Sequence, residues 1–280
     1  MSEISTHWEL NEPFPVSEKQ IEFFRNNGFI KIRDVLSPLD LDTYGKEITK
    51  KVFELNDIHE KPMAERDTYQ KAFLQVTNLW QHSEIVKSFV FSKRLASIAT
   101  ELLGTCGVRL YHDQALYKEP GGGFTPWHAD QYYWPLATEK CCTVWIPLQR
   151  TSLDMGPLAF SAKSHHFSGG RNFKISDESE REIAEALKKQ QFEYVQESFD
   201  PGEISFHYGW TFHRAGPNTT PNPRKVMTII YMDIDMQLKA PENENQALDR
   251  DVFCPGVQLG ETIQTALNPI LYQRDSHQER

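Results

Sequence analysis

Hydrophobic residues in the first hundred positions recur mostly at helical spacing. Ser17 and Gln20 form a capping box ahead of one apolar stripe, and Gly28 supplies a left-handed helix end. Ser37 and Pro38 combine an N-cap with a first-turn proline, which predicts a second helix. A third helix is expected over residues 92–103, and residues 29–35 alternate like a short strand. The pattern of the first hundred residues therefore predicts a helical layer.

Beyond residue 108 the pattern changes to a period of two. Segments rich in β-branched and aromatic residues, separated by Gly and Pro, predict strands at 108–118, 143–148, 203–207 and 225–234. One amphipathic helix is expected between them, at 177–190. We predict a helical N-terminal layer on an antiparallel β-barrel or sandwich, in one domain over residues 1–280 with its core at about 17–235. The polar residues after 269 are expected to fray.

Composition narrows the function classes. Hydrophobic residues make up 39% of the 280 residues, enough for a core. The formal charge of −9 makes a nucleic-acid partner less favourable, because an acidic surface repels phosphates. The sequence contains no apolar run long enough for a membrane span, and its N-terminus lacks the pattern of a signal peptide. We expect a cytoplasmic protein with reduced cysteines and no membrane partner.

One short segment carries candidate metal chemistry. His128 and Asp130 are two apart, so on an extended strand both side chains face one ion. His213 follows a predicted strand about eighty residues later, where a sheet can return it to the first pair. Two histidines and one carboxylate form the facial triad that suits Fe(II) and leaves three coordination positions open. A structural zinc site would normally have a fourth protein ligand, and no cysteine cluster offers one.

Arg224 adds a candidate for anion binding. It lies eleven residues after His213, beyond the proline-marked turn 217–223. A hairpin of that length can place its guanidinium beside the metal ligands. The planar group pairs bidentately with a carboxylate, as the distal carboxylate of 2-oxoglutarate requires.

Several ordered motifs follow one another along residues 17–235. They are Tyr111-His112-Asp113-Gln114, Lys118-Glu119-Pro120-Gly121, Trp127-His128-Ala129-Asp130, Trp145-Ile146-Pro147-Leu148, Gly156-Pro157-Leu158, and His213 to Arg224. In this order they resemble the phytanoyl-CoA dioxygenase family, which also includes ectoine hydroxylase. The resemblance implies a double-stranded β-helix, or jelly roll, and a reaction that uses Fe(II), 2-oxoglutarate and O2.

The resemblance also assigns roles to individual positions. His128, Asp130 and His213 resemble the iron ligands, and Arg224 the partner of the cosubstrate. Further cosubstrate contacts are implied at Gln114, Trp145 and, more loosely, Gln75. Thr143 lies two residues before Trp145 on the same strand face, so we expect its hydroxyl to reach the cosubstrate as well. Where the family often has a serine two residues after the distal histidine, this chain has Ala215, which removes one hydroxyl.

Other side chains leave alternatives open. The aromatic residues near the metal motif either line a substrate pocket or fill the core; they are Trp127, Tyr132, Tyr133, Trp134 and Trp210. The remaining histidines of the β region are interpreted as structural; they are His112, His165, His166 and His207.

The function implied is hydroxylation of a small organic substrate, with release of succinate and CO2. Alternatives are an oxygenase acting on an acyl-CoA, a jelly-roll binding protein without activity, a halogenase, and an isomerase that does not use 2-oxoglutarate. Asp130 argues against a halogenase, which usually has a small residue there, and Arg224 argues against the isomerase. The sequence leaves the oligomeric state open, and a monomer is compatible with it.

Overall fold

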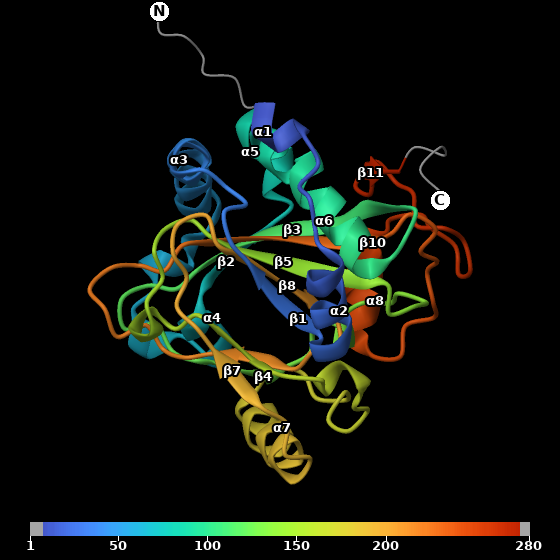
Figure 1. Cartoon of the computed structure of the whole chain (residues 1–280). Coiled ribbons are helices and arrows are strands. Elements are labelled where there is room, and N and C mark those ends of the chain that lie inside the picture. Colours follow the sequence, from blue (N-terminus) through green and yellow to red (C-terminus); the bar gives the residue numbers. More distant parts are fainter. Residues whose placement is uncertain (1–7, 275–280) are drawn as a thin grey trace, which may run out of the picture.

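The computed structural model describes residues 8–274, which form two antiparallel sheets surrounded by helices (Figure 1). The helices are α1 (Trp8–Asn11), α2 (Glu18–Asn27), α3 (Pro38–Leu55), α4 (Thr68–Ala72), α5 (Glu84–Val90), α6 (Lys93–Leu103), α7 (Asp177–Lys189) and α8 (Glu244–Phe253). The strands are β1 (Phe29–Ile32), β2 (Leu74–Thr77), β3 (Gly107–Tyr117), β4 (Thr125–His128), β5 (Cys141–Pro147), β6 (Leu158–Ser161), β7 (Tyr194–Gln196), β8 (Ile204–Tyr208), β9 (His213–Ala215), β10 (Val226–Asp233) and β11 (Ile270–Gln273).

The two sheets give the antiparallel architecture expected of a jelly roll. The larger sheet has the order β1-β8-β5-β10-β3-β11, and β2 pairs with the far half of β3. The smaller sheet has the order β4-β9-β6-β7. The long predicted strands coincide with β3, β5, β8 and β10 to within two residues at each end. The period-two segments therefore identified the centre of the larger sheet.

Alternation along β10 separates a core face from a site face. Met227, Ile229 and Tyr231 belong to the main hydrophobic cluster, which they share with α3, α5 and α6. Thr228, between them, faces the opposite side together with its partners on β3 and β5. Figure 1 shows α3, α5 and α6 on the side of the larger sheet away from β4, β7 and α7. The helices thus cover one face of the larger sheet and leave the other face toward the smaller sheet.

The predicted helix ends in the N-terminal layer are confirmed. Ser17 and Ser37 each form a complete capping box, and Pro38 occupies the first turn of α3. Gly28 ends α2 with φ of 86°, and its amide donates to the carbonyl of Phe24. A side chain at Gly28 would be strained by that φ and would also clash with the His165 ring. Local capping chemistry was therefore enough to set these boundaries.

Several segments differ from the prediction, among them β2, β11 and α8. The first hundred residues also contain β2, which pairs with β3. Residues 270–273 form β11 against the start of β3, so the expectation of fraying was wrong for them; residues 275–280 lie outside the described residues. No helix was predicted at α8. Within residues 8–274, no helix combines the length and apolar character that a membrane crossing needs.

Candidate metal and cosubstrate site

His128 and His213 lie directly opposite each other on neighbouring strands of the smaller sheet. They are register partners in the β4–β9 pair, with ring centroids 4.1 Å apart. Nδ1 of His128 lies 2.7 Å from the carbonyl oxygen of Pro126, and Nδ1 of His213 lies 3.0 Å from that of Thr211. Because a carbonyl only accepts, each Nδ1 donates, and each Nε2 keeps a lone pair for a metal ion.

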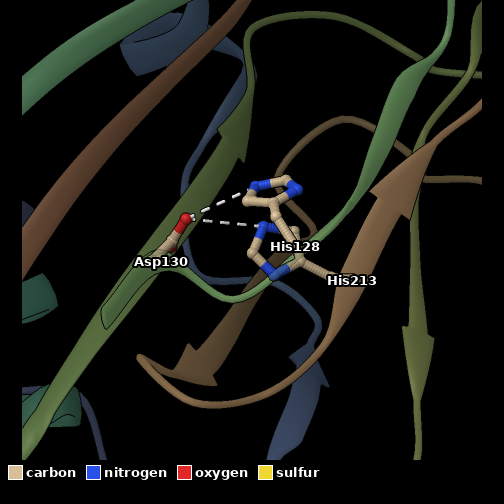
Figure 2. Close-up of side chains that lie close together, drawn as sticks. All are labelled: His128, Asp130 and His213. Atoms are coloured by element: carbon tan, nitrogen blue, oxygen red, sulfur yellow. Dashed lines mark ion pairs between the residues drawn. The ribbon is translucent and has the colours of Figure 1, made fainter. Parts of the chain in front are cut away.

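Asp130 completes a three-ligand set. The backbone remains extended at Ala129 and then enters the short 3-10 turn η4 (Asp130–Tyr132), so the carboxylate joins the same side as His128. Oδ1 of Asp130 lies 3.5 Å from Nε2 of His128 and 3.6 Å from Nε2 of His213 (Figure 2). Within residues 8–274 this is the one group of three or more His, Cys, Asp or Glu side chains close enough to share an ion.

The second carboxylate oxygen of Asp130 is held by the larger sheet. Oδ2 accepts from the hydroxyl of Thr143 at 2.9 Å and from Nε2 of His207 at 3.1 Å. Nδ1 of His207 is buried without a partner, which places the ring proton on Nε2. Thr143 and His207 are themselves register partners on β5 and β8. A carboxylate that directly follows a strand of the smaller sheet is thus oriented by two donors from the larger sheet.

The protonation states of these groups favour metal binding. Burial and the neighbouring His128 lower the pKa of His213 well below its usual value, so the imidazole is neutral. Burial alone would raise the pKa of the Asp130 carboxyl, but its histidine neighbours, among them His207 with its hydrogen bond to Oδ2, hold it well below its usual range. Neutral imidazoles and an ionised carboxylate are the forms that bind a divalent cation. The donor set therefore fits Fe(II).

Arg224 supplies a buried positive charge to the same site. It pairs with Lys118 in an isolated bridge just before β10, and only 2% of its surface is exposed. One Nη donates to the carbonyl of Gly156, while Nε is buried without a partner. No carboxylate among the described residues pairs with it, and burial lowers its pKa to about 9. A buried cation without a counter-ion is unfavourable, which makes this position suited to an anionic ligand.

A cavity of about 560 Å³ joins these groups. Its walls include every residue proposed from the sequence as a site residue: His128, Asp130, His213, Arg224, Gln114, Trp145, Thr143 and Gln75. Gln114 and Trp145 are both register partners of Thr228, so the three side chains share one face. Nε1 of Trp145 is a buried donor without a partner, and Gln75 donates to Gln114. The side-chain donors thus concentrate between the metal ligands and Arg224.

The sequence left open whether five aromatic residues line a substrate pocket or fill the core. In the structure they lie in different places. Tyr133 and Trp134 line the cavity. Trp127 and Trp210 pack in a separate hydrophobic cluster with Ile183 and Phe212. The backbone carbonyl of Tyr132 accepts hydrogen bonds from α8. Pocket wall and core filling are therefore both correct, and Trp134 does both, since it also packs in the hydrophobic cluster with Tyr111 and Phe253.

Sequence reasoning missed two contributions to the site. His207 was interpreted as structural, yet its Nε2 contacts Asp130, the carboxylate of the candidate metal site. The cavity also has a wall formed by α8, whose residues Asn245, Leu248, Asp249, Val252 and Phe253 had no motif to identify them. His165, by contrast, stacks on Tyr208, and its Nε2 lies 3.1 Å from the carbonyl of Arg25.

Comparisons with known proteins agree with this geometry. A model of the phytanoyl-CoA dioxygenase family matches residues 24–226. The chain is 24% identical over 238 residues to a probable alpha-ketoglutarate-dependent hypophosphite dioxygenase of Stutzerimonas stutzeri, covering 78% of this chain and 79% of that protein.

Two solved structures show the same fold. One is the non-haem alpha-ketoglutarate-dependent carbocyclase SnoK from nogalamycin biosynthesis, with a TM-score of 0.73, 23% identity, and coverage of 92% of this chain and 99% of that one. The other is the epimerase SnoN in complex with Fe3+, alpha-ketoglutarate and nogalamycin RO, with a TM-score of 0.72, 20% identity, and coverage of 91% and 98%. The jelly-roll prediction is confirmed.

Proposed function

The chain belongs to the phytanoyl-CoA dioxygenase family, and we propose that His128, Asp130 and His213 bind its iron while Arg224 binds the distal carboxylate of 2-oxoglutarate. The enzyme is a non-haem iron and 2-oxoglutarate dependent dioxygenase. One observation supports the assignment of roles above all others. Arg224 is a buried guanidinium without a counter-ion among residues 8–274, and it lines the same cavity as the three proposed metal ligands.

Each residue has a separate task in this proposal. When bound, iron with 2-oxoglutarate and O2 supplies the oxidising chemistry that hydroxylates a substrate C–H bond and releases succinate and CO2. The two histidines offer Nε2, and Asp130 offers Oδ1 in an orientation fixed by Thr143 and His207. We propose that Trp145 and Gln114 contact the cosubstrate beside Arg224, and Gln75 through Gln114. His128, His213 and Arg224 are buried, which limits the access of water to the reacting groups.

The hydroxyl of Thr143 was expected to reach the cosubstrate. In the structure it donates to Asp130, so we propose that Thr143 acts mainly by orienting the ligand.

The rival functions find less support at this site. A halogenase needs a coordination position that Asp130 fills, and a binding protein that had lost activity would have no need of intact metal ligands together with Arg224. An acyl-CoA carries several phosphates, whereas Lys174 is the one lysine in the cavity lining and Asp249 lies in the same wall. We therefore propose a small organic substrate. We also propose that the whole chain acts as one domain, since α8 lines the cavity and β11 extends the larger sheet.

The test is an anaerobic titration of the Fe(II)-loaded chain with 2-oxoglutarate. We expect a visible charge-transfer band that saturates with one equivalent of 2-oxoglutarate, followed by succinate release on admission of O2 and substrate. A metabolite screen with succinate as the readout then searches for that substrate. Iron binding without the band would contradict the role of 2-oxoglutarate and favour the isomerase alternative.

A further inference from the structure

Helix α8 forms a wall of the cavity outside the region that the family model matches. That match ends at residue 226, and α8 spans Glu244–Phe253. Its cavity-lining residues are three or four positions apart, so they share one face of the helix; they are Asn245, Leu248, Asp249, Val252 and Phe253. An element outside the common motif that faces the reaction cavity is suited to recognising the substrate.

The position of α8 relative to the metal ligands is fixed. The side-chain amides of Asn243 and Gln246 donate to the carbonyl of Tyr132, at 3.3 and 3.1 Å. Tyr132 closes the 3-10 turn that begins with Asp130. At the other end of the helix, Phe253 stacks on His112, with ring centroids 4.1 Å apart. A group bound on α8 is therefore held in a defined relation to the iron ligands.

Asp249 is the charged group that α8 presents to this cavity. Its Oδ2 accepts from the hydroxyl of Tyr111 at 3.3 Å. Among residues 8–274, nothing donates to its Oδ1, and no lysine, arginine or histidine forms an ion pair with the side chain. Burial raises the pKa of this carboxyl to about 7. A partly desolvated carboxylate without a cation is costly to the folded state, and a cationic ligand would offset that cost.

The surroundings of Asp249 are mostly apolar or uncharged. Leu248 and Val252, 62% and 45% exposed, present hydrophobic surface beside it. Burial lowers the pKa of His112 to about 4, so that ring is neutral. Lys174 also lines the cavity but is exposed to solvent, where its charge is screened. The wall therefore combines hydrophobic contacts with one negative charge.

We propose that α8 is the substrate-recognition helix and that Asp249 binds a protonated amino group on an otherwise largely apolar substrate. The proposal rests on the function proposed above and adds the substrate class. The ammonium would donate to the unpartnered Oδ1 in a charge-assisted hydrogen bond, while the apolar body packs on Leu248, Val252 and Phe253. Tyr111 keeps Oδ2 in place, so the carboxylate is already oriented.

The test compares two matched probes, 2-phenylethylamine and 2-phenylethanol. Both carry the same apolar body, and only the amine is charged at pH 8. Calorimetric titrations of the anaerobic Fe(II)–2-oxoglutarate complex of the full chain should give a dissociation constant about tenfold or more lower for the amine. The variant Asp249→Asn preserves shape and the contact with Tyr111, and it should remove this preference while leaving the 2-oxoglutarate titration unchanged.

Asp251→Asn is the matched control. Asp251 is an exposed carboxylate on the same helix, paired with Arg250 at 2.7 Å, and this variant should keep the amine preference. A parent chain that binds the amine no better than the alcohol, or an Asp249→Asn variant that keeps the preference, would overturn the proposal. Absence of the charge-transfer band in the parent would instead contradict the proposed function, so the two failures are distinguishable.

Discussion

The metal end of the cavity and its α8 wall hold their polar atoms in different ways. At the metal end, both Nδ1 atoms bind backbone carbonyls, and Oδ2 of Asp130 has two donors from the opposite sheet. On α8, Asp249 has one hydrogen bond, and two neighbouring apolar side chains are exposed. The comparison indicates that the chemistry is fixed by two sheets acting together, whereas recognition depends on a single helix with atoms left free for a ligand.

Removing a proposed metal ligand should have the largest effect, which is a loss of iron affinity at the metal end of the cavity. In His128→Ala and His213→Ala, iron affinity should fall by more than the about 10- to 100-fold that follows loss of an outer-shell partner. The fold should survive, because neither ring belongs to the main core cluster. Chelator competition measures the affinity, and circular dichroism checks the fold. The exposed His166→Ala is the control; wild-type iron stoichiometry and turnover in both ligand variants would refute the triad.

The next effect in size concerns the anion end of the cavity. Arg224→Lys keeps the charge but loses the planar fork, so the apparent affinity for 2-oxoglutarate should fall about 10- to 100-fold, or about 1.5 to 3 kcal/mol. Iron affinity should change much less. Anaerobic titration with Fe(II) in excess measures the effect. The control is Arg150→Lys, at an exposed pair with Asp200, and equal 2-oxoglutarate affinity in all three proteins would show that Arg224 has another role.

A smaller change tests whether the larger sheet really orients Asp130. His207→Phe retains ring volume but removes the donor to Oδ2, and we expect iron affinity to fall about tenfold. Thr143→Val removes the other donor, and the double variant should differ from the sum of the single effects because both act on one carboxylate. The measured quantity is the dissociation constant for iron, which requires no activity assay. Unchanged iron binding in the double variant would mean that Asp130 is oriented without these two donors.

The smallest expected effect concerns Asp249 on α8 and the way the stability of the folded chain depends on pH. In the folded chain the pKa of Asp249 is raised to about 7, whereas an unfolded aspartate titrates near 4. The folded state therefore binds more protons between these values, and the contribution of Asp249 to stability falls as pH rises through that window.

The variant Asp249→Asn lacks this titrating carboxyl, so it should not lose stability in this way as the pH rises. Its melting temperature should lie a few degrees above that of the parent at pH 8, and the difference should shrink toward pH 4. Thermal melts of the iron-free proteins measure it. Asp251→Asn should show no such pH trend, and a variant that is less stable than the parent at pH 8 would contradict the assigned pKa.

The residues of the candidate site also differ in whether the sequence alone could identify them. His128, Asp130, His213 and Arg224 were identifiable because their spacing along the chain already implies strands that return them to one place. His207 was not, since its contact with Asp130 depends on the register of β5 with β8 and on the packing of two sheets. Such pairing is non-local and leaves no pattern in either segment alone.

The missed elements near the C-terminus have a similar cause. Helix α8 begins within the polar run Glu242 to Asn245, and its apolar residues face a cavity and solvent instead of the main core, so their pattern is weak. Strand β11 is four residues long, and two of them are exposed. Both elements are stabilised by partners far away in sequence, β3 for β11 and Tyr132 for α8.

The attachment of α8 to the carbonyl of Tyr132 has a consequence for engineering this enzyme. Asn243 and Gln246 anchor the start of the helix, and neither lines the cavity, whereas Leu248, Asp249 and Val252 line it. Asn245 does both, because it lines the cavity and its amide donates to the hydroxyl of Tyr132 at 3.4 Å. Anchoring and recognition are thus encoded mostly at different positions of one short segment. A library that randomises residues 248, 249 and 252 while preserving Asn243, Asn245 and Gln246 would explore new substrates on an unaltered oxidation centre.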